Sequence, residues 1–130
     1  KGAYFLVTTP LRSPKEVETA LGNWFRARAR EQFAKRIEAW APWCRKHHLP
    51  NPRLQIRFMK KRWGSAGAGG RIALNPELIH MPAPCIDYVV IHEICHLRHP
   101  AHDKSFFRLL TTLLPNWRAL KKRLECAEAS

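Results

Sequence analysis

This chain of 130 residues lacks several features that mark common classes of protein. No segment is long and apolar enough for a membrane-spanning helix, and no secretory signal is visible, so a cytoplasmic protein is expected. The sequence contains neither internal repeats nor low-complexity linkers. Its four cysteines form no C-x-x-C pair, which predicts reduced, mostly buried thiols. These are Cys44, Cys85, Cys95 and Cys126.

Acidic residues are also scarce. The chain has 23 Lys and Arg against 10 Asp and Glu, a formal net charge of +13, and no acidic residue between Glu38 and Glu77. Such a stretch is either a soluble basic face or a surface for nucleic acid or another polyanion. It matches no sequence-reading module. Its basic residues are Arg45, Lys46, Arg53, Arg57, Lys60, Lys61, Arg62 and Arg71.

The most informative motif in the chain is the run His92-Glu93-Ile94-Cys95-His96, which has the pattern H-E-x-x-H. Residues four apart lie on one face of a helix, so the two histidines can bind one metal ion together. Glu93 can take a proton from a bound water, whose pKa zinc lowers from ~15.7 to about 7. The stretch before the motif is largely apolar, and Pro82, Pro84 and Pro100 bracket a buried helix. The motif predicts a metal-dependent hydrolase; the alternative is a core helix with solvated histidines.

A third protein ligand has two candidates. His99 is three residues after His96, but Pro100 disfavours helical geometry at the residue before it. The chain is expected to turn there, so that His102 swings back towards the metal. His102 is therefore favoured over His99. Both methionines precede the motif, so no downstream Met-turn exists, and Cys95 is interpreted as a packing residue.

The N-terminal part of the chain predicts a strand and a long helix. Residues 3–9 are rich in β-formers, and Ser13 and Pro14 suit the start of a helix. Apolar residues then recur at steps of three and four, which predicts an amphipathic scaffold helix. Pro42 should interrupt it. The stripe consists of Val17, Leu21, Trp24, Phe25, Phe33, Ile37 and Trp40.

Two further strands and two helices are expected. Residues 53–58 alternate strictly, which predicts a half-buried strand with Leu54, Ile56 and Phe58 inward. A glycine-rich turn over residues 64–70 should lead to a strand at 71–75. Its glycines are expected to relieve backbone constraints, since no phosphate-binding loop motif is present. Asp103 can cap the next helix, and Pro115 precedes a last basic helix over residues 117–126.

Four patches resemble the YgjP-like branch of the SprT-like zinc metallopeptidases. They are Lys61-Arg62-Trp63-Gly64-Ser65, residues 71–75, residues 86–97 around the motif, and His102 with Phe106. The resemblance covers roughly residues 14–120, and the length of the chain predicts a single domain over residues 1–130. It implies one zinc ion held by His92, His96 and His102, with Glu93 as general base.

The fold that this resemblance implies is a compact, single-domain α+β zincin-like fold. It has a long N-terminal helix, a small antiparallel or mixed sheet beside the helix that bears the motif, and C-terminal helices. The family usually has Cys where this chain has Ala66, Asn where it has Ala101, and Trp where it has Phe107. None of these departures removes an expected ligand.

The leading hypothesis is a zinc-dependent metallopeptidase that hydrolyses peptide bonds with a zinc-bound water activated by Glu93. An extended substrate could pair with the strand at residues 71–75. One alternative is a pyrophosphatase-like hydrolase of nucleotides or phosphate esters, an activity attributed to part of this family. Another is a nucleic-acid-associated protease recruited by the basic surface. A purely structural zinc site is disfavoured, because closed sites normally have four protein ligands.

Overall fold

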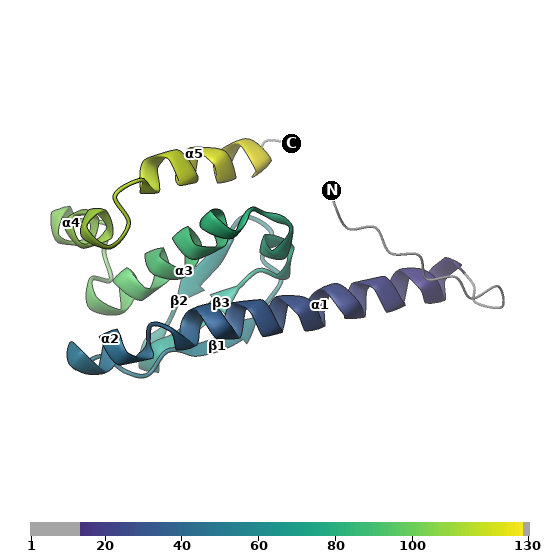
Figure 1. The fold of residues 1–130 in the computed structure, drawn as a ribbon, viewed down its shortest axis with the longest axis horizontal. Helices are drawn as coiled ribbons and strands as arrows, with labels where there is room; N and C mark the ends of the chain where they lie inside the picture. Colours follow the sequence, from purple (N-terminus) through teal and green to yellow (C-terminus); the bar gives the residue numbers. More distant parts are fainter. Residues whose placement is uncertain (1–13, 129–130) are drawn as a thin grey trace.

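The computed structural model describes residues 14–128, so the strand expected at residues 3–9 and the expected cap at Ser13 lie outside the described residues. The chain forms an α+β domain in which a small sheet lies beside helices (Figure 1). The predicted fold class is confirmed. The elements in order are α1 (Pro14–Glu38), α2 (Ala41–Lys46), β1 (Arg53–Ile56), β2 (Gly64–Ala66), η1 (Ala68–Gly70), β3 (Arg71–Leu74), η2 (Pro76–His80), α3 (Ala83–Arg98), α4 (Lys104–Leu113) and α5 (Trp117–Glu128).

The sheet is mixed and has the strand order β1-β3-β2. β1 runs parallel to β3, and β2 runs antiparallel to it, with Ser65 opposite Ala73. β2 was not expected, because the whole segment 64–70 was interpreted as a turn. Gly64 permits the strand to approach α3 closely: a Cβ there would lie 2.9 Å from Cγ1 of Val89. A glycine in a strand often marks such an approach.

The turn that follows β2 needs glycine for a different reason. Gly70 has φ of 85°, in the left-handed region, and a Cβ there would lie 2.4 Å from the carbonyl oxygen of Asn51. Only glycine fits that position without a shift of the backbone. The prediction that glycines in this segment relieve backbone constraints therefore holds at Gly70.

β3 is the central strand, so the expectation that an extended substrate pairs with residues 71–75 is wrong. Both of its edges are hydrogen-bonded, to β1 on one side and to β2 on the other. An extended substrate therefore cannot add to residues 71–75. Within the part of the chain that the structure describes, β2 has one paired edge and one edge without a neighbouring strand.

β1 is shorter than expected. Leu54 and Ile56 are half-buried, as predicted, but the strand ends at Ile56 and Phe58 is 68% exposed. The backbone N–H of Arg57 still donates to the carbonyl of Leu74 at 3.0 Å, after which the chain turns away from the sheet. The inward assignment of Phe58 was therefore wrong, because alternation continues in the sequence beyond the last ladder bond.

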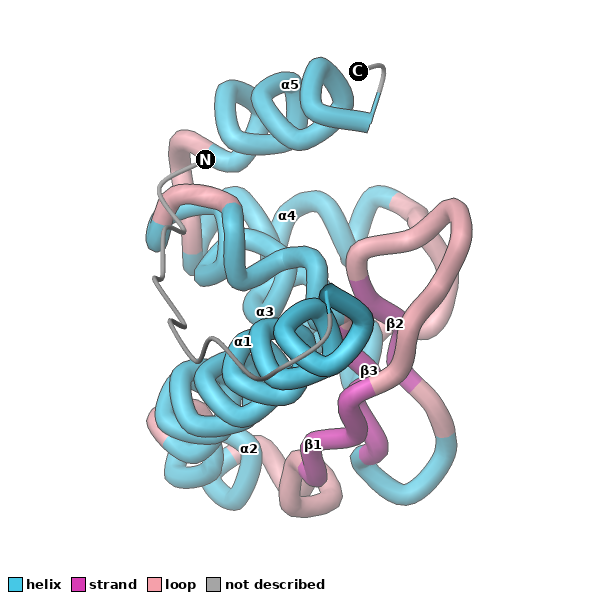
Figure 2. The backbone as a smooth tube through the Cα atoms, turned by 90° about the vertical axis from the view of Figure 1, so that its right-hand side faces the viewer, coloured by secondary structure: helices cyan, strands magenta, loops and turns pink. Residues whose placement is uncertain are grey.

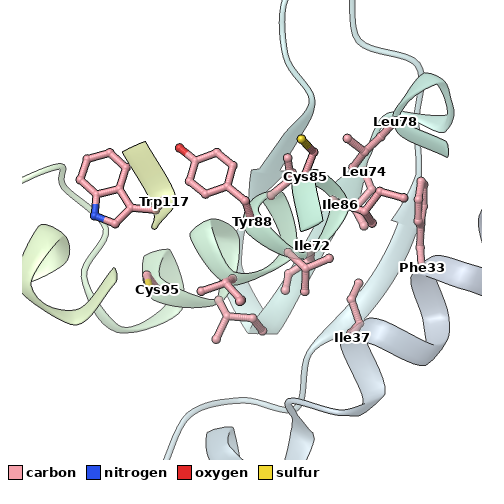
Figure 3. Close-up of a cluster of buried hydrophobic side chains, with 14 of the residues drawn as sticks. Phe33, Ile37, Ile72, Leu74, Leu78, Cys85, Ile86, Tyr88, Cys95 and Trp117 are labelled. Carbon is pink, nitrogen blue, oxygen red and sulfur yellow. The ribbon is translucent and has the colours of Figure 1, made fainter. Parts of the chain in front are cut away.

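Helices α1 and α3 cover one face of the sheet, and α4 and α5 pack on α3 on the side away from the strands (Figures 1 and 2). Among the residues of α1 whose side chains the structure describes, 22–38, the core includes Ala29, Phe33 and Ile37. Figure 3 shows Phe33 and Ile37 pointing from α1 towards the residues buried around α3. Trp24, which the predicted stripe placed inward, is 42% exposed.

The helix boundaries follow the prolines. α1 ends at Glu38, and α2 begins at Ala41 with Pro42 in its first turn, where a missing N–H costs nothing. α5 runs two residues further than the 117–126 expected for it. Across the described residues, no helix is long and apolar enough to cross a membrane.

Candidate metal centre and catalytic cleft

The helix that carries the motif is α3, Ala83–Arg98, which begins after Pro82 and ends at His99 just before Pro100. It is buried from Cys85 to Cys95 apart from Asp87 and His92, since it packs against the sheet, α4 and α5. Cys95 is fully buried, as expected for a packing residue. This burial fixes the rotation of α3 and so decides where His92 and His96 point.

Three imidazole rings meet at the end of α3. The Nε2 atom of His102 lies 2.8 Å from Nε2 of His96 and 3.3 Å from Nε2 of His92. One ring nitrogen from each residue lies within 4.8 Å of the other two. His99 is outside this group: it is the C-cap of α3 with extended backbone angles, as the proline after it favours. Asp103 caps α4 instead, accepting from the N–H of Phe106 at 3.0 Å.

Hydrogen bonds hold two of the rings from behind. Nδ1 of His96 lies 3.2 Å from the carbonyl oxygen of His99, an acceptor, so this nitrogen carries the proton. Nε2 of His96 then presents a lone pair to the cluster. Nδ1 of His92 lies 3.4 Å from the hydroxyl of Tyr88, one turn earlier on α3. Such bonds on the far nitrogen orient histidine ligands.

Phe106 of α4 lies against all three rings. Its ring centroid is 5.0 Å from that of His92, 4.4 Å from that of His96 and 4.9 Å from that of His102. The ring of His96 stacks on it, and the other two meet it edge-on. Phe106 is fully buried, so it forms a fixed apolar floor beneath the histidines.

Burial favours the neutral form of His92 and His96. Burial, followed by the neighbouring charges of His96, His102 and Lys121, lowers the pKa of His92 to about 4. Burial is also the main cause that lowers the pKa of His96. A neutral imidazole offers the lone pair that a metal needs, whereas an imidazolium does not.

The three nitrogens fit a zinc ion. Nitrogen ligands about 2.0–2.1 Å from one tetrahedral zinc are about 3.4 Å apart. The Nε2 atoms of His102 and His92 are 3.3 Å apart, and those of His102 and His96 are closer, at 2.8 Å. One ring nitrogen of each residue faces the other two, and a metal cation is a partner that three such lone pairs can bind together. The set has three members, the number typical of catalytic zinc.

Glu93 faces the cleft beside the histidines. Its side chain is 6% exposed, and burial raises its pKa to about 7, although the positive charge of Arg62 opposes the shift. A carboxylate with a pKa near neutrality both accepts and releases a proton readily at neutral pH. Its position next to His92 in the helix brings it to the same cleft.

The cleft is a cavity of about 810 Å³, large enough for several residues of a substrate. Its walls come from α3, from the segment that runs through β2, and from α5. The side chains and main chain around it include Arg62, Trp63, residues 64–70, Tyr88, His92, Glu93, His96, His102, Lys121, Leu124 and Glu125. Glu93 and the three histidines therefore open onto one space with the three residues of β2.

Several residues of this cleft were not among the site residues predicted from the sequence. Tyr88 had a usable signal, since it precedes His92 by four residues and so shares its face of the helix. Lys121 and Glu125 had none, because only the packing of α5 on α3 brings them to the cleft. The eight basic residues singled out earlier are all exposed, and Arg62 alone among them lines the cavity.

Comparisons with known proteins identify the family and a similar fold. The model of the YgjP-like metallopeptidase domain matches residues 4–127. The crystal structure of the metallopeptidase zymogen abylysin from Pyrococcus abyssi has a similar fold, with a TM-score of 0.59 and 20% identity. The match covers 70% of this chain and 93% of that one. No curated protein matches the chain.

Proposed function

Since this chain belongs to the YgjP-like family of metallopeptidase domains, we propose that it is a zinc-dependent peptidase whose general base is Glu93. The observation that carries the proposal is the meeting of three imidazole nitrogens beside a buried carboxylate in one cavity. Three histidines without a fourth protein ligand suit catalysis better than a structural role.

His92, His96 and His102 would hold the zinc ion, and Phe106 and the His99 carbonyl would keep their rings in place. When bound there, zinc lowers the pKa of water and polarises a carbonyl group. Glu93 accepts the proton of the attacking water on its carboxylate and afterwards passes it to the nitrogen of the leaving amine. The burial of Glu93 favours the protonated form between these two transfers.

β2 is the strand on which an extended peptide would lie. It has an unpaired edge, and all three of its residues line the cavity. Main-chain hydrogen bonds to such an edge bind a peptide in register without requiring particular side chains. The peptide would therefore pass the histidines and Glu93 in an extended form.

Three variants test the proposal, with His99→Ala as the matched control. Glu93→Gln should bind zinc at the wild-type stoichiometry but lose peptide hydrolysis, because the amide cannot accept the proton. His102→Ala should lose both zinc and hydrolysis, whereas His99→Ala should keep both, since its ring is outside the cluster. Metal content by mass spectrometry and cleavage of casein are the measurements. Full activity of Glu93→Gln would refute the mechanism.

A second candidate function is hydrolysis of a phosphate ester, which the positive charge of Arg62 in the cavity favours. The zinc-loaded protein would be incubated with nucleoside triphosphates and with casein in parallel. Release of pyrophosphate without proteolysis would replace the peptidase proposal by this one.

We also propose that the exposed basic residues between Glu38 and Glu77 bind nucleic acid and so recruit the peptidase to it. Phe58, 68% exposed, lies in a loop among Arg57, Lys60 and Lys61, and an exposed ring among cations is typical of single-strand binding. Binding to a labelled oligonucleotide should weaken as salt rises, with log K linear in log salt. No binding at low salt would leave these charges as a solvated face.

A further inference from the structure

The cavity wall has one lysine or arginine, Arg62, that forms no ion pair within the described residues, although its charge acts on Glu93. Of its charged side chains apart from the histidines, Lys121 and Glu125 form an ion pair on α5, one turn apart. Glu93 is nearly enclosed. Arg62 is exposed and, within the described residues, makes no side-chain hydrogen bond or ion pair. Its guanidinium group therefore keeps its donors available to a ligand in the cavity.

The backbone of Arg62 is held in place by Asn75, a buried side chain at the end of β3. Nδ2 of Asn75 donates to the carbonyl of Arg62 at 3.0 Å and to that of Met59 at 2.7 Å. The N–H of Asn75 also donates to the carbonyl of Trp63 at 2.9 Å. These three bonds fasten the loop before β2 to the sheet. A cation on a fixed loop pays less conformational entropy when it binds than one on a mobile loop.

Arg62 also lies at the end of the proposed peptide track. It lies two residues before the start of β2, and both line the same cavity as His92 and Glu93. A peptide paired with the edge of β2 would thus bring one of its groups to Arg62 while its backbone passes the histidines. The planar guanidinium matches a carboxylate through two parallel hydrogen bonds.

We propose that Arg62 forms a recognition subsite for a substrate carboxylate, so that the cleft prefers peptides with an acidic group close to the bond that is cut. The inference rests on the proposed peptidase function and adds a substrate class to it. The carboxylate has two possible sources, an acidic side chain within the peptide or the free C-terminus of the peptide.

Three sets of decapeptides separate these sources. The first has one Glu and an amidated C-terminus, the second has Gln in its place and is also amidated, and the third has Gln and a free C-terminal acid. Each set moves the variable residue along the chain, and products are identified by mass spectrometry. The comparison is made for wild type, Arg62→Gln, Arg62→Lys and Arg30→Gln. Arg30 is an exposed arginine of α1 that does not line the cavity.

The wild type should cleave one carboxylate set about 10- to 100-fold more efficiently by kcat/KM than the neutral amidated set, as expected for charge-assisted hydrogen bonds. Arg62→Gln should reduce this ratio to about one, Arg62→Lys should leave it intermediate because lysine cannot bind in the bidentate manner, and Arg30→Gln should retain it. Preference for the first set assigns a side-chain carboxylate, and preference for the third assigns the C-terminus. Equal loss of activity on all sets in Arg62→Gln would overturn the subsite.

A binding measurement separates the failure of this inference from the failure of the proposed function. Metal-free wild type and Arg62→Gln would be titrated with the same peptides, and amide chemical shifts of β2 followed by NMR. A carboxylate preference that depends on Arg62 supports the subsite even if no peptide is cleaved. Cleavage of all peptides without any preference, in binding or in rate, overturns the subsite and leaves the peptidase proposal standing.

Discussion

The aromatic ring of Phe106 should hold the three histidines in the arrangement that binds metal, and its replacement tests this most directly. Phe106 is fully buried, with ring centroids 4.4–5.0 Å from those of His92, His96 and His102. Phe→Ala at such a site costs about 3–5 kcal/mol, a large part of the roughly 5–15 kcal/mol that stabilises a domain. Leucine is the better replacement, because it keeps most of the volume and removes only the ring.

The expected loss for Phe106→Leu follows from its contacts. Aromatic pairs contribute about 0.5–1.5 kcal/mol each beyond burial, and the contributions of three pairs sharing one ring do not add fully. The free energy of unfolding of the metal-free protein should therefore fall by about 2–3 kcal/mol. Zinc affinity should fall by about 10- to 100-fold, the range for residues that orient metal ligands.

Leu110→Ala is the matched control. Leu110 is also fully buried, one turn further along α4, but makes no ring contact with the histidines. Its replacement should destabilise the protein by about 2–5 kcal/mol with little change in zinc affinity. Urea unfolding gives the stabilities, and competition with a chelator under native conditions gives the affinities. The reasoning is refuted if Phe106→Leu binds zinc as tightly as wild type, or if both variants lose affinity in proportion to stability.

Three further predictions concern the rest of the molecule. Asn75→Asp keeps the acceptor for the N–H of Glu77 but loses the two donors to the carbonyls of Met59 and Arg62. The free energy of unfolding in urea should therefore fall by about 2–3 kcal/mol. An unchanged unfolding midpoint would contradict the role of these two hydrogen bonds in holding the loop before β2. Asp87→Asn removes the ion pair with Arg36 that joins α3 to α1. Because both side chains are partly exposed, the free energy of unfolding should fall by less than about 1 kcal/mol, and by less still in high salt. At pH 8 an alkylating reagent should modify the exposed Cys126 first, because burial shields the other three thiols and raises their pKa, which lowers their thiolate fraction. Mass spectrometry gives the order of labelling. Early labelling of any of the three other cysteines would contradict their burial. Those thiols are Cys44, Cys85 and Cys95.

Local signals in the sequence determined the helix of the metal centre. The spacing of His92 and His96, the apolar stretch before them and the prolines on both sides predict a buried helix, which the structure places at Ala83–Arg98. Pro100 also decides that His99 leaves the helix. These features depend on residues close together in the chain, and backbone sterics act over that range.

The sheet shows where such local reasoning stops. The alternation of polar and apolar residues continues to Phe58, two residues beyond the end of β1. The glycines of residues 64–70 predict a turn, although residues 64–66 form β2. Whether a segment becomes a strand depends on a partner elsewhere in the chain, here β3, and on the close approach to Val89 that Gly64 allows. Pairing across the chain carries no local signature, so the unpaired edge in the cleft could not be identified in advance.

The sequence by itself therefore determined the chemistry of the candidate site: the three histidines, the carboxylate and the helix that carries two of the ligands. Only the tertiary structure decided what surrounds them. It places Phe106 beneath the rings, brings Lys121 and Glu125 from α5 to the cavity, and makes Arg62 the one among the eight basic residues that lines it. The spacing of His92 and His96 is a property of one helix, whereas the walls of a cleft depend on how separate elements pack against that helix.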